Sequence, residues 1–317
     1  MPFVGQPSTA PSWFPKRIAG SWNLGSAAIA RTLKHAKTAR GIHPERRLNI
    51  TCEEVRLMTS DGVGLSAWYV PAPESVRPSK PLCAVLHHHY GGQKATVLPW
   101  VEFFHRLGIA SLSFDARGHG ASDPAPRGRG SFVHRAADVT AACEEARSRG
   151  AERLLGFGQS QGAASLVMAV VGRDDLAGCI LDSGPAPEMG TAAWGLAGNM
   201  LGRAGRERPW TRALLSARIV PGTQPVRYLC SLWMALSGLR KVPLFWIHGD
   251  RDRVIRRRWS RLWYEALRPN NQTWQCAEIE GAEHVRCLQI GGESLEQQLA
   301  AFIIGLSHGP DEVSRTD

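Results

Sequence analysis

The chain has 317 residues, 43% of them hydrophobic and 21% charged, which is the composition of a soluble globular protein with a substantial core. The formal net charge is +10, but no recognisable nucleic-acid-binding module accompanies it, and no apolar run reaches the roughly 18 residues that a membrane-spanning helix needs. The seven cysteines are odd in number and irregularly spaced, which excludes a disulfide framework or a CxxC metal pattern and fits a reducing cytoplasm.

Residues 1–49 are predicted to form an extension that precedes the main domain. Its first 25 residues are rich in proline, glycine and serine and predict irregular structure, whereas residues 26–40 predict a helix. Basic side chains recur along that helix at three-residue spacing, at Arg31, Lys34, Lys37 and Arg40. Such a stripe could contact an anionic membrane surface, but Ile29 and Leu33 offer little apolar area. We therefore expect this helix to pack across the main domain.

Strand and helix signals alternate through a domain predicted to span residues 50–307. Strands are predicted at 54–59, 64–70, 82–87, 109–114, 152–157, 178–181, 242–247 and 273–279, and helices at 95–106, 132–148, 163–171, 257–267 and 294–306. The first two strands form a hairpin around a Ser-Asp-Gly turn. Several later runs are continuously apolar, which is typical of parallel strands buried on both faces. The pattern predicts an α/β fold with a doubly wound, mostly parallel sheet.

Residues 185–240 break this alternation. They contain helical pieces with tryptophan and leucine, interrupted by Pro209, Pro221 and Pro225. We interpret this segment as a helical lid inserted into the domain rather than as a second domain. The chain then ends in a polar tail, residues 308–317.

Six arginines cluster shortly after the insertion. A basic cluster can attract anionic groups, but a solvated basic face is the better interpretation here. The cluster comprises Arg251, Arg253, Arg256, Arg257, Arg258 and Arg261.

The most informative motif is Gly-Gln-Ser-Gln-Gly at residues 158–162, where an apolar strand runs directly into a helix. This is the sequence form of a nucleophile elbow, a sharp turn that exposes the hydroxyl of Ser160. Gly158 and Gly162 are required because a Cβ at either position would collide with the adjoining strand or helix. A plain glycine turn is the alternative interpretation.

A serine hydroxyl needs a general base, and the base needs a group that orients it. An acid and then a histidine should follow Ser160, each at the carboxyl end of a strand. Asp250 and Asp252 follow the strand at 242–247, and His284 follows the strand at 273–279. These spacings predict a Ser-His-Asp triad at one rim of the sheet.

Taken together, these motifs resemble the α/β-hydrolase superfamily over residues 50–307. Further similarities are the turn Asp-Ala-Arg-Gly-His-Gly at 115–120 and the loop His-His-His-Tyr-Gly-Gly at 87–92. The resemblance favours Asp252 over Asp250 as the acid and keeps Asp182 as a third candidate, because some relatives carry the acid after that strand. The aspartate that is not catalytic would order the loop or cap the following helix.

The resemblance also implies an oxyanion hole made of two backbone N–H groups, those of Gln161 and Tyr90. His89 is a departure, since the family commonly has glycine at that place in the loop. A metal site is not expected at the three adjacent histidines, because successive side chains of a strand point to opposite faces. We expect no cofactor.

The resulting expectation is a serine hydrolase that cleaves a small-molecule carboxylic ester or thioester through an acyl-enzyme. Gln161 and Tyr90 resemble the corresponding residues of acetyl esterases that act on sugars and cephalosporins. Trp194, Trp210 and Trp233 of the insertion could line an acyl pocket. The alternative is a non-catalytic binding protein that retains the hydrolase fold.

Overall fold

The computed structural model describes residues 42–74, 80–126, 134–185, 197, 209–222, 225–269 and 273–307. The helix predicted at 26–40, the tail at 308–317 and Trp194 lie outside these residues. Within the described ranges no helix is long and apolar enough to cross a membrane. Of the predicted N-terminal extension, the structure describes one short helix, α2 (Pro44–Leu48), which His43 precedes as N-cap.

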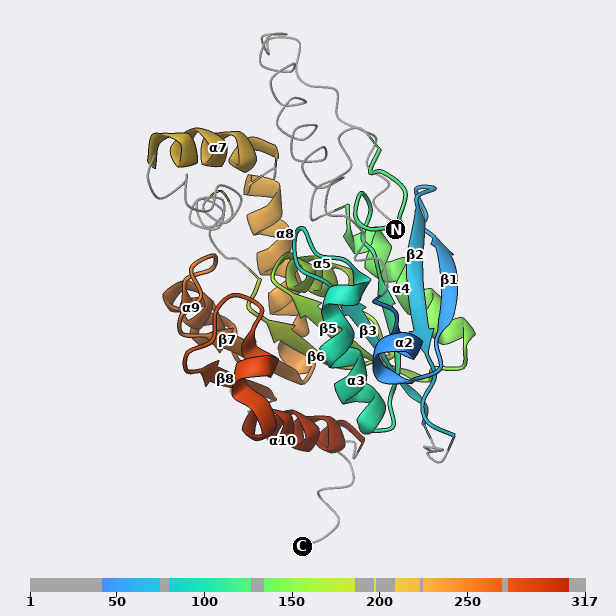
Figure 1. Cartoon of the computed structure of the whole chain (residues 1–317). Helices are drawn as coiled ribbons and strands as arrows, with labels where there is room; N and C mark the ends of the chain where they lie inside the picture. Colours follow the sequence, from blue (N-terminus) through green and yellow to red (C-terminus); the bar gives the residue numbers. More distant parts are fainter. Residues whose placement is uncertain are drawn as a thin grey trace, which may run out of the picture.

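A single sheet of eight strands forms the centre of the described part of the chain (Figure 1). Its order is β1-β2-β4-β3-β5-β6-β7-β8. The pairs β1–β2 and β2–β4 are antiparallel, and the remaining neighbours in this order pair in parallel. The strands are β1 (Glu53–Met58), β2 (Gly64–Val70), β3 (Leu82–His87), β4 (Ala110–Phe114), β5 (Arg153–Gln159), β6 (Leu176–Asp182), β7 (Leu244–Gly249) and β8 (Trp274–Ile279). The predicted doubly wound, mostly parallel sheet is confirmed.

Helices cover both faces of this sheet. One face carries α3 (Leu98–Arg106) and α10 (Cys287–Ser307), whose aromatic and aliphatic side chains pack on β3, β5 and β7. The other carries α4 (Ala136–Ser148), α5 (Gln161–Val170), α8 (Pro225–Gly238) and α9 (Arg257–Leu267). Short 3-10 helices, η1 (Lys94–Val97) and η2 (Leu239–Lys241), precede α3 and β7.

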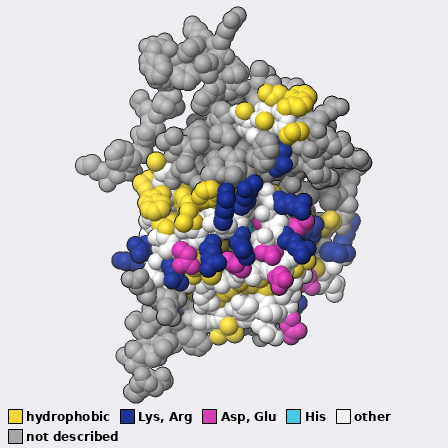
Figure 2. All heavy atoms as spheres, turned by 90° about the vertical axis from the view of Figure 1, so that its left-hand side faces the viewer, with side chains coloured by type: hydrophobic (Ala, Val, Ile, Leu, Met, Phe, Trp, Pro, Cys, Tyr) yellow, Lys and Arg dark blue, Asp and Glu magenta, His cyan; other side chains and the backbone are white. Residues whose placement is uncertain are grey.

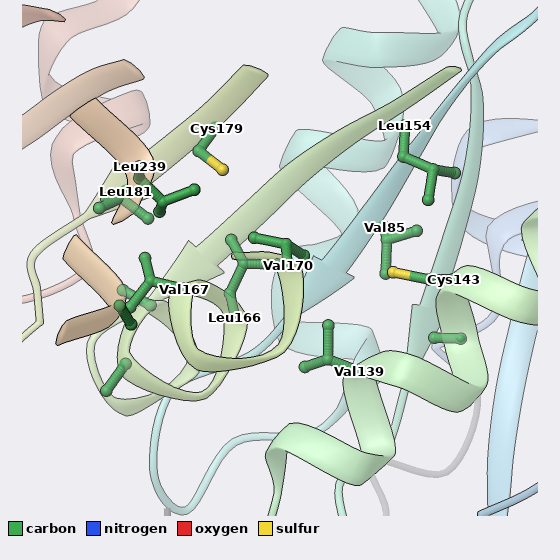
Figure 3. Packing of buried hydrophobic residues seen from close by; sticks show 14 of the residues in the cluster. Val85, Val139, Cys143, Leu154, Leu166, Val167, Val170, Cys179, Leu181 and Leu239 are labelled. Atoms are coloured by element: carbon green, nitrogen blue, oxygen red, sulfur yellow. The ribbon is translucent and has the colours of Figure 1, made fainter. Parts of the chain in front are cut away.

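Two apolar layers hold these helices to the sheet. Figure 3 shows the layer beneath α4 and α5, where Val85, Leu154 and Cys179 of the strands meet Val139 and Leu166 of the helices. All five side chains are buried, and full burial of one aliphatic side chain stabilises a fold by about 1.5–3 kcal/mol. The central strands are therefore fixed from both sides, and with them the rim at which their carboxyl ends meet.

Element ends differ from the sequence expectation at several helices. The helix expected at 132–148 is α4, which begins at Ala136. The last helix was expected at 294–306, but α10 begins at Cys287 and has a kink at Gly292 (φ 51°, ψ −143°). The adjacent Gly291 and Gly292 hide the helical periodicity of its first turn. The elbow helix begins at Gln161 rather than at residue 163, because the turn at Ser160 ends within a single residue.

The predicted insertion contains two described helices, α7 (Pro209–Gly222) and α8. Each begins at a proline, which is favoured in the first turn of a helix. Leu232 and Leu236 of α8 are buried and pack in the same apolar layer as α5. Trp210 and Leu214 of α7 are exposed. That these helices act as a lid stays a prediction.

The six clustered arginines are all exposed. Arg257 and Arg261 of α9 lie 3.0 and 3.9 Å from Glu278 of β8, and Arg258 lies over Trp259. Figure 2 shows basic side chains interspersed with acidic ones on this side of the molecule. This agrees with a solvated basic face.

Candidate active site

Ser160 lies in the turn between β5 and α5. Its backbone has φ 54° and ψ −114°, a conformation that is unfavourable for a residue with a side chain and costs about 1–3 kcal/mol. Its N–H donates to the carbonyl oxygen of Asp182, at 2.8 Å. The side chain is largely buried at the carboxyl end of the central strand, with 7% of the residue exposed. The strand-turn-helix context predicted for the motif is confirmed.

Close backbone packing surrounds this turn. A Cβ on Gly158 would lie 2.6 Å from the backbone of Ala163, and one on Gly162 would lie 2.5 Å from the carbonyl oxygen of His87. The first contact is with the elbow helix itself, and the second is with the neighbouring strand β3. Neither position has room for a side chain, so both must be glycine, as predicted from the sequence.

Replacing Gly162 with alanine is expected to lower the free energy of unfolding by about 1–3 kcal/mol, because the new methyl group overpacks α5 against β3. Gly305 in α10 is the matched control, since nothing lies within 4 Å of a Cβ placed there. Alanine at that helical position should be neutral or stabilise by up to about 1 kcal/mol. Chemical denaturation of both variants measures the difference. Equal stability of the two would contradict the close approach.

A chain of hydrogen bonds joins the three predicted triad residues. His284 Nε2 lies 2.9 Å from Ser160 Oγ, and His284 Nδ1 lies 2.7 Å from Asp252 Oδ2. With the carboxylate as acceptor, Nδ1 carries the proton and Nε2 is free to accept the serine proton. Residues 124 positions apart in the sequence thus meet in the geometry of a nucleophile, a base and an orienting acid.

The carboxylate of Asp252 is held on both of its oxygens. Oδ1 accepts the backbone N–H groups of Val254 and Ile255 at 2.8 and 2.9 Å, which leaves Oδ2 for His284. His248 Nε2 lies 3.4 Å from Oδ2 and 2.8 Å from the carbonyl oxygen of Ile255. The side chain of Asp252 is fully buried, so its direction toward His284 is fixed by the loop.

The other two candidate acids make different contacts. Asp250 is exposed and accepts the backbone N–H of Gly281 at 2.7 Å, which ties its loop to that of His284. Asp182 accepts from Gln159 Nε2 and from the Ser183 hydroxyl, and burial raises the pKa of its carboxyl. Neither of them is hydrogen-bonded to the imidazole of His284 in the described residues.

The loop that carries His284 is anchored to the ends of two strands. Ser183 Oγ accepts the N–H of Val285 at 3.0 Å, directly after the histidine. The N–H of Arg251 donates to the carbonyl oxygen of Ala282, and Gly249 packs so closely that a Cβ there would lie 2.2 Å from that oxygen. Sequence patterns gave no signal for Ser183, because its contact depends on how the two loops approach.

Two of the three adjacent histidines, His87 and His88, hold the loop after β3 together with their side chains. His87 Nδ1 donates to the carbonyl oxygen of His88, and His88 Nδ1 donates to that of His89. His88 Nε2 then accepts the N–H of Ala116 at 3.1 Å, which joins the loop to the end of β4. Burial lowers the pKa of His88 and of His89 to about 4, so both are neutral near pH 7. No group of three or more metal-ligating side chains occurs in the described ranges.

Tyr90 and Gln161 carry the two N–H groups predicted for the oxyanion hole. Gln161 is the first residue of α5, so its N–H has no acceptor within the helix. In the loop, Gly91 donates to His119 Nε2 at 3.4 Å and Gly92 donates to the carbonyl oxygen of His89. For the N–H of Tyr90 the described residues supply no acceptor. Both donors are thus available to a bound group.

Comparison with known proteins gives a family and a set of similar folds. The model of the alpha/beta hydrolase family matches residues 85–297, more than half of the chain. No curated protein matches the sequence.

Among solved structures, esterase Pf2001 from Pyrococcus furiosus is 20% identical with a TM-score of 0.65, over 84% of this chain and 94% of that one. The alpha/beta hydrolase GrgF from Penicillium sp. sh18 is 18% identical with a TM-score of 0.57, over 81% and 99%. An esterase from Exiguobacterium antarcticum is 16% identical with a TM-score of 0.56, over 80% and 100%. At these identities the likeness establishes a shared fold.

Proposed function

This chain belongs to the alpha/beta hydrolase family, and we propose that it is a serine hydrolase that cleaves a small-molecule carboxylic ester or thioester through an acyl-enzyme. The observation that carries the proposal is the unbroken hydrogen-bonded path from Ser160 Oγ through His284 to Asp252. A serine without such a base is a poor nucleophile at neutral pH.

In the proposed reaction, Ser160 Oγ bonds to the substrate carbonyl carbon while its proton passes to His284 Nε2. Asp252 stabilises the resulting imidazolium and keeps the ring in the required tautomer. The tetrahedral intermediate collapses as the bond to the leaving oxygen or sulfur breaks, and His284 returns the proton to that atom. Water then attacks the acyl carbon while His284 takes its proton. The bond to Ser160 Oγ breaks, the carboxylic acid is released, and the proton returns from His284 to Ser160.

The backbone N–H groups of Gln161 and Tyr90 would bind the negative oxygen of each tetrahedral intermediate. Removing one such donor typically lowers kcat by about 10²–10³-fold. No cofactor takes part in this chemistry. The resemblance of Gln161 and Tyr90 to acetyl esterases favours short acyl groups, and the exposed rings of Trp210 and Trp233 offer apolar surface to longer ones.

We also propose a reducing, cytoplasmic setting. All seven cysteines are free, and five of them are buried. Buried free cysteines behave as small apolar residues, so these five thiols fit a packing role better than a role in disulfide bonds.

A fluorophosphonate probe, followed by mass spectrometry of the labelled peptide, tests the proposed function. We expect one adduct, on Ser160, that is absent from the Ser160→Ala variant. Turnover of p-nitrophenyl esters from acetyl to palmitoyl then gives the acyl preference. A folded protein that forms no adduct and cleaves none of these esters would instead favour the alternative, a binding protein that retains the hydrolase fold.

A further inference from the structure

A buried arginine lies behind the two residues of the proposed oxyanion hole. Arg135 directly precedes α4, and 5% of the residue is exposed. Its Nη1 donates to Gln161 Oε1, and its guanidinium carbon lies 5.7 Å from the centre of the Tyr90 ring. One cation therefore contacts side chains from the elbow helix and from the loop after β3, two elements that are far apart in the sequence.

We propose that Arg135 is a positioning residue for the oxyanion hole. It fixes the side chains of Gln161 and Tyr90, and through them the backbone N–H groups that those residues carry. This inference rests on the proposed function. Oxyanion stabilisation depends on donors that are already oriented before the reaction, so a shared anchor for the two donors would act mainly on the transition state.

The charge of Arg135 is retained at a cost. Removing a cation from water is unfavourable unless other groups compensate, and burial accordingly lowers the pKa of this guanidinium. Asp138 of α4 acts in favour of the charged form, and Arg117 acts against it. A neutral side chain would fill the same space more cheaply, so packing alone gives no reason for an arginine here.

The same cation adds to the effect of burial on the surrounding histidines. Burial is the main cause of the lowered pKa of His87, His88 and His119, and the charge of Arg135 lowers each of them further. As neutral rings they donate from Nδ1 to backbone carbonyl oxygens and, at His88 and His119, accept backbone N–H groups with Nε2. Arg135 is thus a buried cation whose charge acts on the neutral rings that hold the loop of Tyr90.

Arg117 shows what a buried arginine with a purely structural role looks like in this chain. It is fully buried, and its guanidinium binds the carboxylates of Asp61 and Asp138 at 2.8 Å each. Those contacts join the hairpin turn to α4. The contacts of Arg135 with Gln161 and Tyr90 lead instead to the two proposed oxyanion residues.

The test compares Arg135→Gln and Arg135→Lys with Arg149→Gln. Arg149 follows α4, lies 4.3 Å over the Tyr69 ring and donates to Glu53 and Glu145, so it makes contacts of the same kinds away from the site. For p-nitrophenyl acetate we expect Arg135→Gln to lower kcat by about 10–100-fold, less than the loss of a donor itself. We expect KM to change less than about threefold, Arg135→Lys to recover part of kcat, and Arg149→Gln to have no effect on kcat.

A second variant keeps the test decisive if Arg135→Gln does not fold. Gln161→Met removes the acceptor of Arg135 but leaves the backbone N–H in place, and it should also lower kcat with little change in KM. Wild-type protein that fails to react with the fluorophosphonate probe would overturn the proposed function. Wild-type protein that reacts, with folded Arg135→Gln or Gln161→Met reacting equally fast, would overturn the role of Arg135 alone.

Discussion

Replacing His284 with alanine is expected to lower kcat for p-nitrophenyl acetate by about 10⁶-fold, the size of effect that removal of the base has in a serine triad. The reason is local, since Nε2 of this ring is the group 2.9 Å from Ser160 Oγ. Fluorophosphonate labelling should slow in parallel. Circular dichroism and the unfolding midpoint of the variant check that the fold is retained. A folded variant with more than a hundredth of the wild-type kcat would contradict the assigned base.

The two aspartates of the loop after β7, Asp250 and Asp252, give a second prediction about the same triad. Asp252→Asn is expected to lower kcat by about 10⁴-fold, because an amide at that place favours the wrong imidazole tautomer. Asp250→Asn is the matched control, since Asp250 is exposed and bonds a backbone N–H of the neighbouring loop. We expect it to change kcat less than about threefold, within the small effect usual for surface substitutions. Equal losses in the two variants would leave the acid unassigned.

The predicted triad could be found from sequence because each member follows a recognisable strand. Ser160, Asp252 and His284 come after β5, β7 and β8, whose apolar runs are local signals, and the carboxyl ends of parallel strands share one rim. The structure brings the three side chains together. Their catalytic roles stay a prediction.

The choice between Asp250 and Asp252 could not be made from the residues alone. Both carboxylates lie in one loop, two positions apart, and nothing in the composition of the loop says which one is buried. Their difference comes from the backbone N–H groups of Val254 and Ile255, which hold one oxygen of Asp252 and direct the other. Only the family resemblance pointed to Asp252 in advance.

Arg135 gave no sequence signal at all. It lies in no motif, and the helix that it precedes was expected to begin at residue 132, before it. Its contacts with Gln161 and Tyr90 arise because α5 and the loop after β3 both approach the start of α4. Contacts of this kind depend on tertiary packing, and periodicity carries no information about them.

The protein is expected to lose stability steeply as the pH falls from 7.5 to 5, because five histidines, four of them buried and His89 half-buried, are neutral in the folded state. Burial lowers the pKa of each from the ordinary 6.5, to about 4 for two of them; the five are His87, His88, His89, His119 and His248. Since the folded pKa lies below the unfolded one, the unfolded chain binds protons first. The stabilisation is therefore present above pH 6.5 and is lost as the pH falls toward the folded pKa.

The expected loss is a large fraction of the stability of a domain. A histidine with a folded pKa of about 4 loses about 2 kcal/mol between pH 7.5 and 5, against a total of about 5–15 kcal/mol for a typical protein. Asp138 and Asp182 act in the opposite direction, because burial raises their pKa and a raised carboxyl pKa favours the folded state at low pH. The histidines outnumber them, so the net slope should stay positive.

Urea denaturation at pH 5, 6 and 7.5 measures this slope directly. In His119→Asn the difference in bound protons between the unfolded and folded states, which sets the slope, should fall by up to one. The variant lacks a ring that is buried in the fold and takes up a proton in the unfolded chain. The slope is the informative quantity, because the substitution can also shift stability at every pH through lost contacts. An unfolding free energy that is constant from pH 7.5 to 5 would mean that these rings titrate alike in the folded and unfolded chain. That result would contradict neutral rings at His88 and His119, whose Nε2 atoms accept backbone N–H groups.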